Sequence, residues 1–389
     1  MTSSQAGLGP YIIGRGLHST LGSTLASSIA ALREPIRKPG QAVFKFAGQE
    51  AVQPYHLLAN EPLGDPEERF YRVVERVVAD AIDEAQLTAT ERRRLTLFFG
   101  SSSSDISMLE ALYRRELERD SEAKPMRTNT SFGKLGADLA ARLGLQGADF
   151  TINTACTASA NALLHAASLI RGGEIEHALV LGVELCNAVT ALGFSSLQLL
   201  SEETMRPFDR GQAGLILGEA CAAVVLSKRR ESALVNVIGG ANLCDTFSPS
   251  SANPDGSSIV QVIERALKST NLSASDIAAI KVHGTANRAN DEAESAGIRK
   301  VFDHLPPLCA LKPRIGHTLG ACGLAELLLV CGAAHEGFLP ATPGIGADTA
   351  EFGVTLLQQS AAFESGPLML NYFGFGGSNT SLIVLPGAS

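Results

Sequence analysis

Segments that fit β-strands alternate with segments that fit α-helices along nearly the whole chain, and this alternation limits the fold more than any other sequence feature. Short apolar runs typical of strands lie at 11–14, 95–99, 150–153, 178–183 and 221–226. Helical spacing of apolar residues appears between them at 21–32, 68–85 and 160–170. A second series follows, with strands at 235–238, 277–282, 368–371 and 382–384 and helices at 260–267, 291–302 and 324–334. The pattern predicts an α/β protein, with sheets covered by helices.

Length and composition predict two halves that pack as one body. At roughly 150 residues per domain, 389 residues suggest two domains. The hydrophobic content of 45%, the 38 glycines and the absence of tryptophan indicate a large core of small and aliphatic side chains. A charged turn at 228–231 separates the two series of elements. We therefore place the boundary near 230, with an N-terminal half over 1–230 and a C-terminal half over 231–389.

Charge and hydropathy argue against two classes of partner. The formal net charge of −8 does not fit nucleic-acid binding, which depends on clustered Lys and Arg. The short basic runs 92–94 and 228–230 are flanked by acids and fit solvated surface. No apolar run reaches the ~20 residues of a membrane span, and the first residues do not resemble a signal peptide. We expect a cytoplasmic protein that binds neither nucleic acid nor membrane.

Motifs for a resident cofactor or metal are weak or missing. Gly14 and Gly16 follow a strand, as in a dinucleotide-binding turn, but Ser19 occupies the third glycine position. The chain has no G-x-S-x-G motif and no phosphate-binding loop. Its seven cysteines form no C-x-x-C pair, so we expect free thiols and no metal site.

One cysteine has the surroundings of a nucleophile. Cys156 lies between a strand that ends near Asn153 and a helix that starts near Ala160, among small Ala, Thr and Ser residues. Backbone amides at a helix start favour a thiolate, and the small neighbours leave room for an acyl group. An inert buried cysteine remains an equal alternative at this point.

Two histidines shift the balance towards catalysis. His283 and His317 each follow a strand-like run and stand in a Gly/Thr context, and Lys312 precedes His317 by five residues. Side chains at the carboxyl ends of strands line the active crevices of α/β proteins. A Cys/His/His zinc site is the competing hypothesis, although zinc ligands usually include a closely spaced pair. The glycine-rich segment 371–379 adds a loop that can approach a ligand closely.

Together these segments resemble the β-ketoacyl-acyl carrier protein synthases, the condensing enzymes with a Cys-His-His triad. Five motifs carry the resemblance, in order: 154–159, 206–219, 283–285, 312–320 and 371–379. The stretch 14–22 also fits, so the likeness covers nearly the whole chain. It implies a thiolase-like fold, in which two similar α/β halves form a five-layered αβαβα body.

The resemblance also implies a role for each catalytic residue. Cys156 would accept an acyl chain from a carrier thioester, with the amides of Cys156 and Phe375 as the oxyanion hole. Malonyl carrier protein would then lose carbon dioxide, and neutral His283 and His317 would stabilise the enolate. Lys312 would set the local electrostatics and orient the second histidine, His317.

Other residues receive supporting or binding roles by the same resemblance. Glu294 would support the network of the triad, and Phe375 would act as a gate between the half-reactions. Thr285 would contact the pantetheine arm. The remaining residues assigned to substrate binding are Asn287, Asp245 and Gly376.

Three places depart from the family pattern. Asn287 stands where a second Thr is common, and Gln212 and Ala213 replace an Arg and an acid. Ser248 stands where the second gating loop usually has His. These differences leave the details of arm binding and gating open and suggest a specialised branch.

The sequence distinguishes this hypothesis from other functions of related proteins. A thiolase would need a second catalytic cysteine in 373–378, and a chain-initiating synthase would have Asn rather than His317. A chain-length-factor-like partner subunit would lack Cys156, so it remains the less favoured hypothesis.

We therefore expect a free-standing condensing enzyme of type II fatty acid or polyketide/polyene biosynthesis. It would act as a homodimer or as a heterodimer with a homologous subunit. It would need no cofactor of its own, because phosphopantetheine arrives on the acyl carrier protein. Lys124 and Arg127 are candidate docking residues for that acidic carrier.

Overall fold

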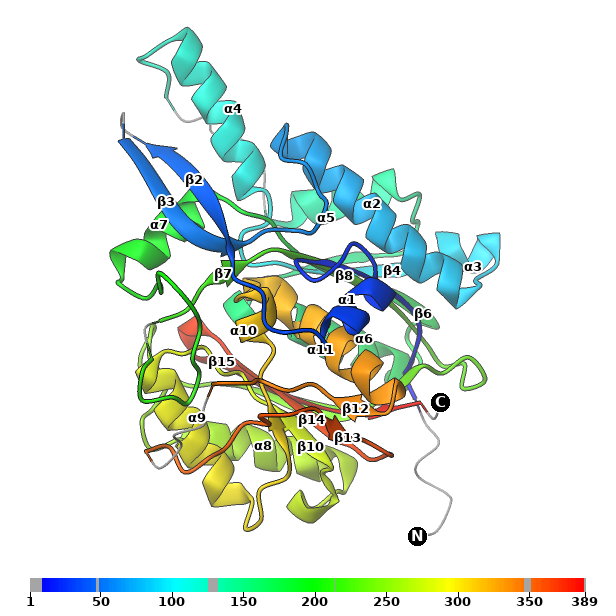
Figure 1. The fold of residues 1–389 in the computed structure, drawn as a ribbon. Helices are drawn as coiled ribbons and strands as arrows, with labels where there is room; N and C mark the ends of the chain where they lie inside the picture. Colours follow the sequence, from blue (N-terminus) through cyan, green and yellow to red (C-terminus); the bar gives the residue numbers. More distant parts are fainter. Residues whose placement is uncertain (1–8, 47–48, 125–131, 213, 346–350, 388–389) are drawn as a thin grey trace.

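The computed structural model describes residues 9–46, 49–124, 132–212, 214–345 and 351–387. Two sheets are stacked with a layer of helices between them, and further helices cover both outer faces (Figure 1). This is the five-layered αβαβα arrangement that the family resemblance implies.

The first sheet is built by the N-terminal half. Strand β4 (Thr96–Gly100) pairs in parallel with β5 (Asp149–Ile152) on one side and with β6 (His177–Glu184) on the other. Strand β8 (Ala220–Ser227) runs antiparallel to β6 and also to β1 (Tyr11–Ser19).

The second sheet repeats this order of pairings. Strand β10 (Ala279–Lys281) is parallel to β11 (Leu308–Cys309) and β14 (Leu368–Phe373). Strand β15 (Ser378–Pro386) is antiparallel to β14 and to β9 (Val235–Cys244). Each half thus has two parallel pairings followed by two antiparallel strands. A short pairing of β1 with β9 links the two sheets into one series of ten hydrogen-bonded strands.

The central layer consists of α6 (Ala158–Gly172), α11 (Cys322–His335) and the short α1 (Leu25–Ala31). Every residue of α11 from 322 to 334 is buried, as expected for a helix that is apolar on all sides. Its side chains share one core with α6 and with strands of both sheets. The central helices therefore hold the two halves together as one body.

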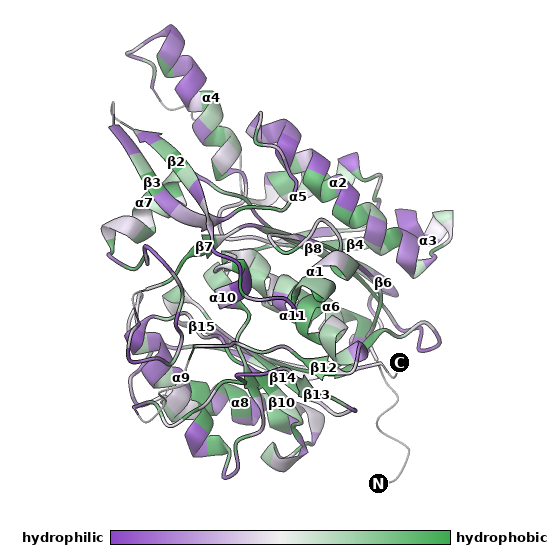
Figure 2. Cartoon of the chain, viewed as in Figure 1, coloured by the Kyte–Doolittle hydropathy of each residue, from purple (hydrophilic) through white to green (hydrophobic). Residues whose placement is uncertain are grey.

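The outer helices are amphipathic. The first sheet is covered by α2 (Pro66–Ala85) and α5 (Phe132–Arg142), with α3 (Ala89–Arg93) beyond the end of α2. The second sheet is covered by α8 (Ser257–Thr270) and α9 (Arg288–Val301). Figure 2 shows hydrophilic and hydrophobic residues alternating along α2, whose apolar face lies on the sheet.

The pair Gly14 and Gly16 has a packing role. Both lie inside β1, where a Cβ atom would overlap the backbone carbonyls of Ala81 and Val77 on α2. Only glycine permits this close approach of helix and strand. The glycines that suggest a dinucleotide-binding turn are therefore explained by the contact with α2.

Several elements are not predicted from the sequence. They include the hairpin of β2 (Gly40–Phe46) and β3 (Gln49–His56), together with α4 (Ile106–Arg119) and α7 (Ala188–Ser196). Helix α4 buries only Met108, so its pattern carries little periodic signal. The remaining short elements are β7 (Leu217–Gly218), α10 (Lys312–Ile315), β12 (Phe338–Leu339) and β13 (Ala361–Ala362). Among the described residues, no helix combines the length and hydropathy needed to cross a membrane.

Candidate active site

Cys156 lies in a sharp connection between β5 and α6. A turn of 3-10 helix, Ala155–Thr157, follows β5 and leads directly into α6. Ala155 has a φ of 50°, which lies in the left-handed region that residues with a Cβ atom rarely adopt. The Cys156 side chain is buried. This strained connection brings the thiol to the two histidines of the C-terminal half.

The turn that carries Cys156 is tied to the glycine-rich loop. The Oγ1 of Thr157 lies 2.8 Å from the Oγ of Ser378, and Asn161 Nδ2 donates to Thr154 Oγ1 at 2.9 Å. A Cβ atom on Gly374 would lie 3.2 Å from the Cys156 nitrogen. The two segments are therefore in direct contact, although more than two hundred residues separate them.

His317 faces the thiol. Its Nε2 lies 3.1 Å from the Sγ of Cys156. Its Nδ1 accepts a hydrogen bond of 3.3 Å from the amide of Leu319. A neutral imidazole whose Nδ1 accepts carries its proton on Nε2. His317 therefore points an N–H at the sulfur, which suits it to stabilise a thiolate.

His283 is oriented by Lys312. The Lys312 ammonium lies 3.2 Å from His283 Nδ1 and donates to the His283 carbonyl at 2.7 Å. Because an ammonium can only donate, Nδ1 accepts and the proton resides on Nε2. That Nε2 is buried and has no hydrogen-bond partner. The expectation that Lys312 orients His317 is wrong, since the Leu319 amide does so and Lys312 binds His283.

The two imidazoles meet edge to face, with ring centroids 5.5 Å apart. Burial and the Lys312 charge hold the pKa of both His283 and His317 well below the usual value. Both rings are consequently neutral at pH 7. The site offers two neutral N–H donors beside one sulfur, which is the arrangement that an anion on oxygen needs.

Burial dominates the pKa of the Cys156 thiol in this closed site. It raises the pKa of the Cys156 thiol to about 11, while the Lys312 charge and the amides of Phe375 and Cys156 act in the opposite direction. The amides thus favour the thiolate as the sequence suggests, but burial outweighs them. Both amides therefore interact with the Cys156 sulfur itself.

Two buried carboxyl groups hold the loop that follows β10. Glu294 on α9 accepts hydrogen bonds from the amides of His283 at 2.7 Å and Gly284 at 2.9 Å. Burial raises its pKa to about 7. Asp291 accepts from the amides of Thr285 at 3.2 Å and Phe208 at 2.8 Å. The carboxyl groups therefore fix the backbone on which His283 and Thr285 are mounted.

Phe375 closes the cavity above the thiol. Its ring stacks on that of Phe194 from α7, with centroids 5.8 Å apart and an interplanar angle of 8°. The cavity volume is about 10 Å³, which is room for about one water molecule. Any acyl chain on Cys156 therefore requires these side chains to move.

Asp245 shapes the glycine-rich loop from outside the cavity. Its carboxylate accepts hydrogen bonds from the Phe247 amide at 2.9 Å and the Ser258 hydroxyl at 2.6 Å. Its own amide donates to the Gly377 carbonyl at 2.7 Å. Gly377 and Gly376 have φ values of 77° and 79°. Neither Asp245 nor Gly376 lines the cavity.

The cavity gathers most of the predicted residues. Its described lining consists of Cys156, Phe194, Leu215, His283, Thr285, Asn287, Asn290, His317, Phe373 and Phe375. Lys312 and Glu294 lie directly behind it. The Asn287 side chain caps α9 by accepting from the Asn290 amide at 3.3 Å, so its carbonyl oxygen is already engaged. Of the docking candidates, Lys124 is exposed, and Arg127 lies outside the described residues.

Several residues of this region are not predicted from the sequence. Phe194, Leu215, Phe373 and Asn290 line the cavity, and Glu326 and Lys281 lie behind it. Glu326 has a detectable signal, because it is the only acid in the apolar run 322–334. In the described part of the chain, no group of three or more His, Cys, Asp or Glu is placed to hold a metal ion.

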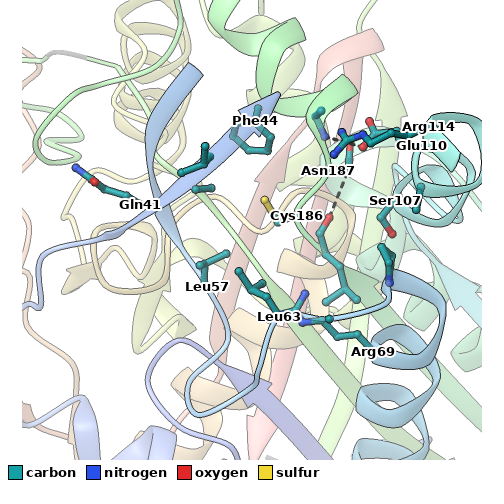
Figure 3. A pocket seen from close by; sticks show the side chains of 17 residues that line it. Gln41, Phe44, Leu57, Leu63, Arg69, Ser107, Glu110, Arg114, Cys186 and Asn187 are labelled. Carbon is teal, nitrogen blue, oxygen red and sulfur yellow. Dashed lines mark hydrogen bonds between the residues drawn. The ribbon is translucent and has the colours of Figure 1, made fainter. Parts of the chain in front are cut away.

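A second cavity, of about 320 Å³, lies between the β2–β3 hairpin, α4 and the start of α7 (Figure 3). Its lining contains no triad residue and includes Phe44, Cys186 and Glu110. The Glu110 carboxylate accepts hydrogen bonds from the amides of Ala188 at 2.9 Å and Val189 at 2.6 Å. This edge of the cavity therefore fixes the start of the helix that carries Phe194.

Two family models match the chain. The model of the β-ketoacyl synthase N-terminal domain matches residues 66–232, and that of the C-terminal domain matches residues 235–345. Together they cover well over half of the sequence. The chain belongs to the β-ketoacyl synthase family.

Relatives of known function support this assignment. The chain is 31% identical over 269 residues to the chloroplastic 3-oxoacyl-[acyl-carrier-protein] synthase II of Arabidopsis thaliana, covering 64% of this chain. The match spans about half, 49%, of that plant protein. It is 26% identical over 327 residues to 3-oxoacyl-[acyl-carrier-protein] synthase 2 of Vibrio harveyi, covering 78% of each chain.

Solved structures confirm the thiolase-like fold. A chain from the complex of a ketosynthase with its chain length factor, from Xenorhabdus doucetiae, matches with a TM-score of 0.84 at 26% identity and full coverage of both chains. A β-ketoacyl synthase from Burkholderia phymatum matches with a TM-score of 0.82 at 23% identity, covering 98% of this chain and 100% of its own. The second likeness shows the fold alone.

Proposed function

We propose that this protein catalyses a decarboxylative Claisen condensation between an acyl group on Cys156 and malonyl-acyl carrier protein. The observation that carries the proposal is the 3.1 Å approach of His317 Nε2 to the Cys156 sulfur, with a second unpartnered Nε2 on His283 in the same cavity. The names of the relatives, 3-oxoacyl-[acyl-carrier-protein] synthases, support the same reaction.

The first half-reaction is transfer of the acyl chain. The Cys156 sulfur attacks the carbonyl carbon of the carrier thioester, and the carbonyl oxygen becomes an anion that accepts from the amides of Cys156 and Phe375. The bond to the pantetheine sulfur then breaks, and that sulfur takes the proton lost by Cys156. The products are a thioester on Cys156 and a free carrier thiol.

The second half-reaction forms the carbon–carbon bond. Breaking the bond to the malonyl carboxylate releases carbon dioxide and leaves its electron pair in a thioester enolate. The neutral Nε2–H groups of His283 and His317 donate to the enolate oxygen. The enolate carbon attacks the acyl carbonyl, and cleavage of its bond to Cys156 restores the thiolate and gives β-ketoacyl carrier protein.

Supporting roles follow from position. Phe375 acts as the gate, because its stack on Phe194 must open before a chain enters. Thr285, at the cavity wall, binds the pantetheine arm, and Asn287 contributes to that wall. Asp245 and Gly376 act on substrate binding through the shape of the loop. No resident cofactor is required, and location in the cytoplasm remains a prediction from the sequence.

The partners are an acyl carrier protein and a second thiolase-like subunit, identical or homologous. A second candidate function is that of a chain-length-factor-like subunit with little activity of its own. The likeness to a chain from a ketosynthase–chain length factor complex supports this second candidate. The presence of Cys156 beside His317 favours the catalytic role.

Incubation with malonyl carrier protein and a panel of acyl carrier proteins, read by mass, tests the proposal. A product longer by two carbons than the acyl donor is expected for at least one donor. Acylation of Cys156 without any condensation product would contradict the proposal. Activity that appears only after adding a homologous subunit would indicate a heterodimer.

A further inference from the structure

Behind the two histidines lies a buried cluster of three charges, Lys281, Glu326 and Lys312. The Glu326 carboxylate accepts from Lys312 Nζ at 2.8 Å through Oε1 and from Lys281 Nζ at 2.6 Å through Oε2. All three side chains are 0% exposed. With both lysines protonated and the carboxylate ionised, the cluster carries one net positive charge.

Both lysines are engaged by several neighbouring groups. Lys312 gives its three N–H groups to Glu326, to the His283 carbonyl and to His283 Nδ1. Lys281 donates to Glu326 and to the Asn371 carbonyl at 2.7 Å, and its ammonium lies 3.5 Å from the centre of the Tyr372 ring. The Tyr372 hydroxyl in turn donates to the Gly323 carbonyl at 2.9 Å. Lys281 therefore joins β10, β14 and α11 at one point.

Lys281 determines which acceptors Lys312 can bind. Glu326 has two oxygens, and an unpaired carboxylate oxygen in a dry interior is costly. Without Lys281, Oε2 would have to turn to Lys312, which has no donor left unless it releases His283. The bond from Lys312 to His283 Nδ1 fixes the proton on Nε2, so the cluster controls the donor that faces the cavity.

We propose that Lys281 is a positioning residue for the decarboxylation step: by sharing Glu326 with Lys312, it keeps Lys312 on His283 and adds a positive charge behind both catalytic imidazoles. This inference rests on the proposed function of the same site. Lys281 does not touch the cavity, so it acts through Lys312 and through charge.

The surroundings of the cluster contain few other charges. The titratable groups facing Lys281 and His283 are Glu326, Cys322, Lys312, Cys309, Tyr372, Glu294 and His317. Burial is the main reason that the pKa of His283 is low, and the charges of Lys312 and Lys281 lower it further. Removing the Lys281 charge should therefore raise the pKa of His283.

The test is the pH profile of carbon dioxide release from malonyl carrier protein by the full-length protein. In Lys281→Met, the acid side of the profile, where protonation of His283 Nδ1 removes the acceptor that Lys312 binds and so releases the ring from its position, should move up by about one pH unit. At a pH below both midpoints this is about a tenfold loss relative to wild type. Acylation of Cys156, followed by intact mass, should stay within a few fold.

A double variant separates charge from structure. Lys281→Met combined with Glu326→Gln again leaves one net positive charge, and the amide carbonyl introduced at position 326 can still accept from Lys312. The acid midpoint of this variant should return to the wild-type value. Arg314→Met is the matched control, because Arg314 is also a buried cation but hydrogen-bonds the carbonyls of Ala341 and Glu34. It should leave the midpoint in place.

The outcomes distinguish this inference from the proposed function. A wild-type protein that releases no carbon dioxide overturns the proposed function itself. An active wild type whose acid midpoint is unchanged in Lys281→Met overturns only the role of Lys281. An equal shift in Arg314→Met, or a double variant that shifts as far as the single one, overturns it also. If Lys281→Met does not fold, Lys281→Arg keeps the charge and should retain the wild-type midpoint, and a displaced midpoint there counts against the proposal.

Discussion

Replacing His283 by alanine should separate the two half-reactions. His283 Nε2 is directed into the cavity without a partner, whereas the contact with the Cys156 sulfur comes from His317. A hydrogen bond to a charged group contributes about 1.5–3 kcal/mol. Each step of about 1.36 kcal/mol corresponds to a factor of ten in rate. His283→Ala should therefore slow carbon dioxide release by about 10-fold to 150-fold, while acylation of Cys156 changes by only a few fold.

The assay uses one enzyme preparation and two readouts. Carbon dioxide release from malonyl carrier protein is followed in a coupled assay, and the mass of the acylated protein is followed over time with an acyl carrier protein. His317→Ala serves as the comparison and should slow both reactions, because His317 faces the thiol as well as the cavity. Equal losses in the two half-reactions of His283→Ala would refute the division of labour between the histidines.

Three further predictions concern the gate, the loop and the thiol. Phe194→Ala removes the ring on which Phe375 stacks and should speed acylation of Cys156 by longer chains, as read by mass; an unchanged chain-length preference would count against the gate. Gly377→Ala should lower the free energy of unfolding, measured with denaturant, by more than Gly376→Ala does. Both variants lose about 1–2 kcal/mol because the new residue is held in the left-handed region. Only at Gly377 would the new Cβ also overlap the Asp245 carbonyl. Equal losses would contradict that overlap. Burial raises the pKa of the Cys156 thiol to about 11. The rate at which iodoacetamide alkylates Cys156 should therefore rise about tenfold per pH unit between about pH 7 and 10, and a plateau of this rate by about pH 8 would contradict the raised pKa.

Much of the fold is predictable because its elements are long, buried and periodic. Strands β4, β6 and β8 and helices α2, α6 and α11 all lie where apolar runs and helical spacing indicate. The β2–β3 hairpin and α4 are not predictable in this way. Their side chains are largely exposed, as Val43 at 55% and Val52 at 53% illustrate, so burial imposes no clear pattern on them.

The residues of the candidate site also differ in how far the sequence predicts them. Cys156 and His283 stand out because each follows a strand and has small neighbours. His317 stands out by its small neighbours, but the strand expected before it is wrong, because residues 312–315 form the short helix α10. The hydrogen-bond partner of Lys312 cannot be predicted in this way, because the bond between Lys312 and His283 depends on how β10 and α10 are placed in space. Lys281 carries no motif at all. The role proposed for Lys281 can be recognised only in the structure, where α11 places Glu326 between Lys281 and Lys312.

The central claim, that Cys156 is the nucleophile of a condensing enzyme, is tested most directly by Cys156→Ala. With an acyl carrier protein and malonyl carrier protein as substrates, the wild type should gain the mass of the acyl group and form a product two carbons longer. The variant should show neither the mass gain nor the product, while its unfolding curve stays close to that of the wild type. Condensation at the wild-type rate in Cys156→Ala would contradict the account.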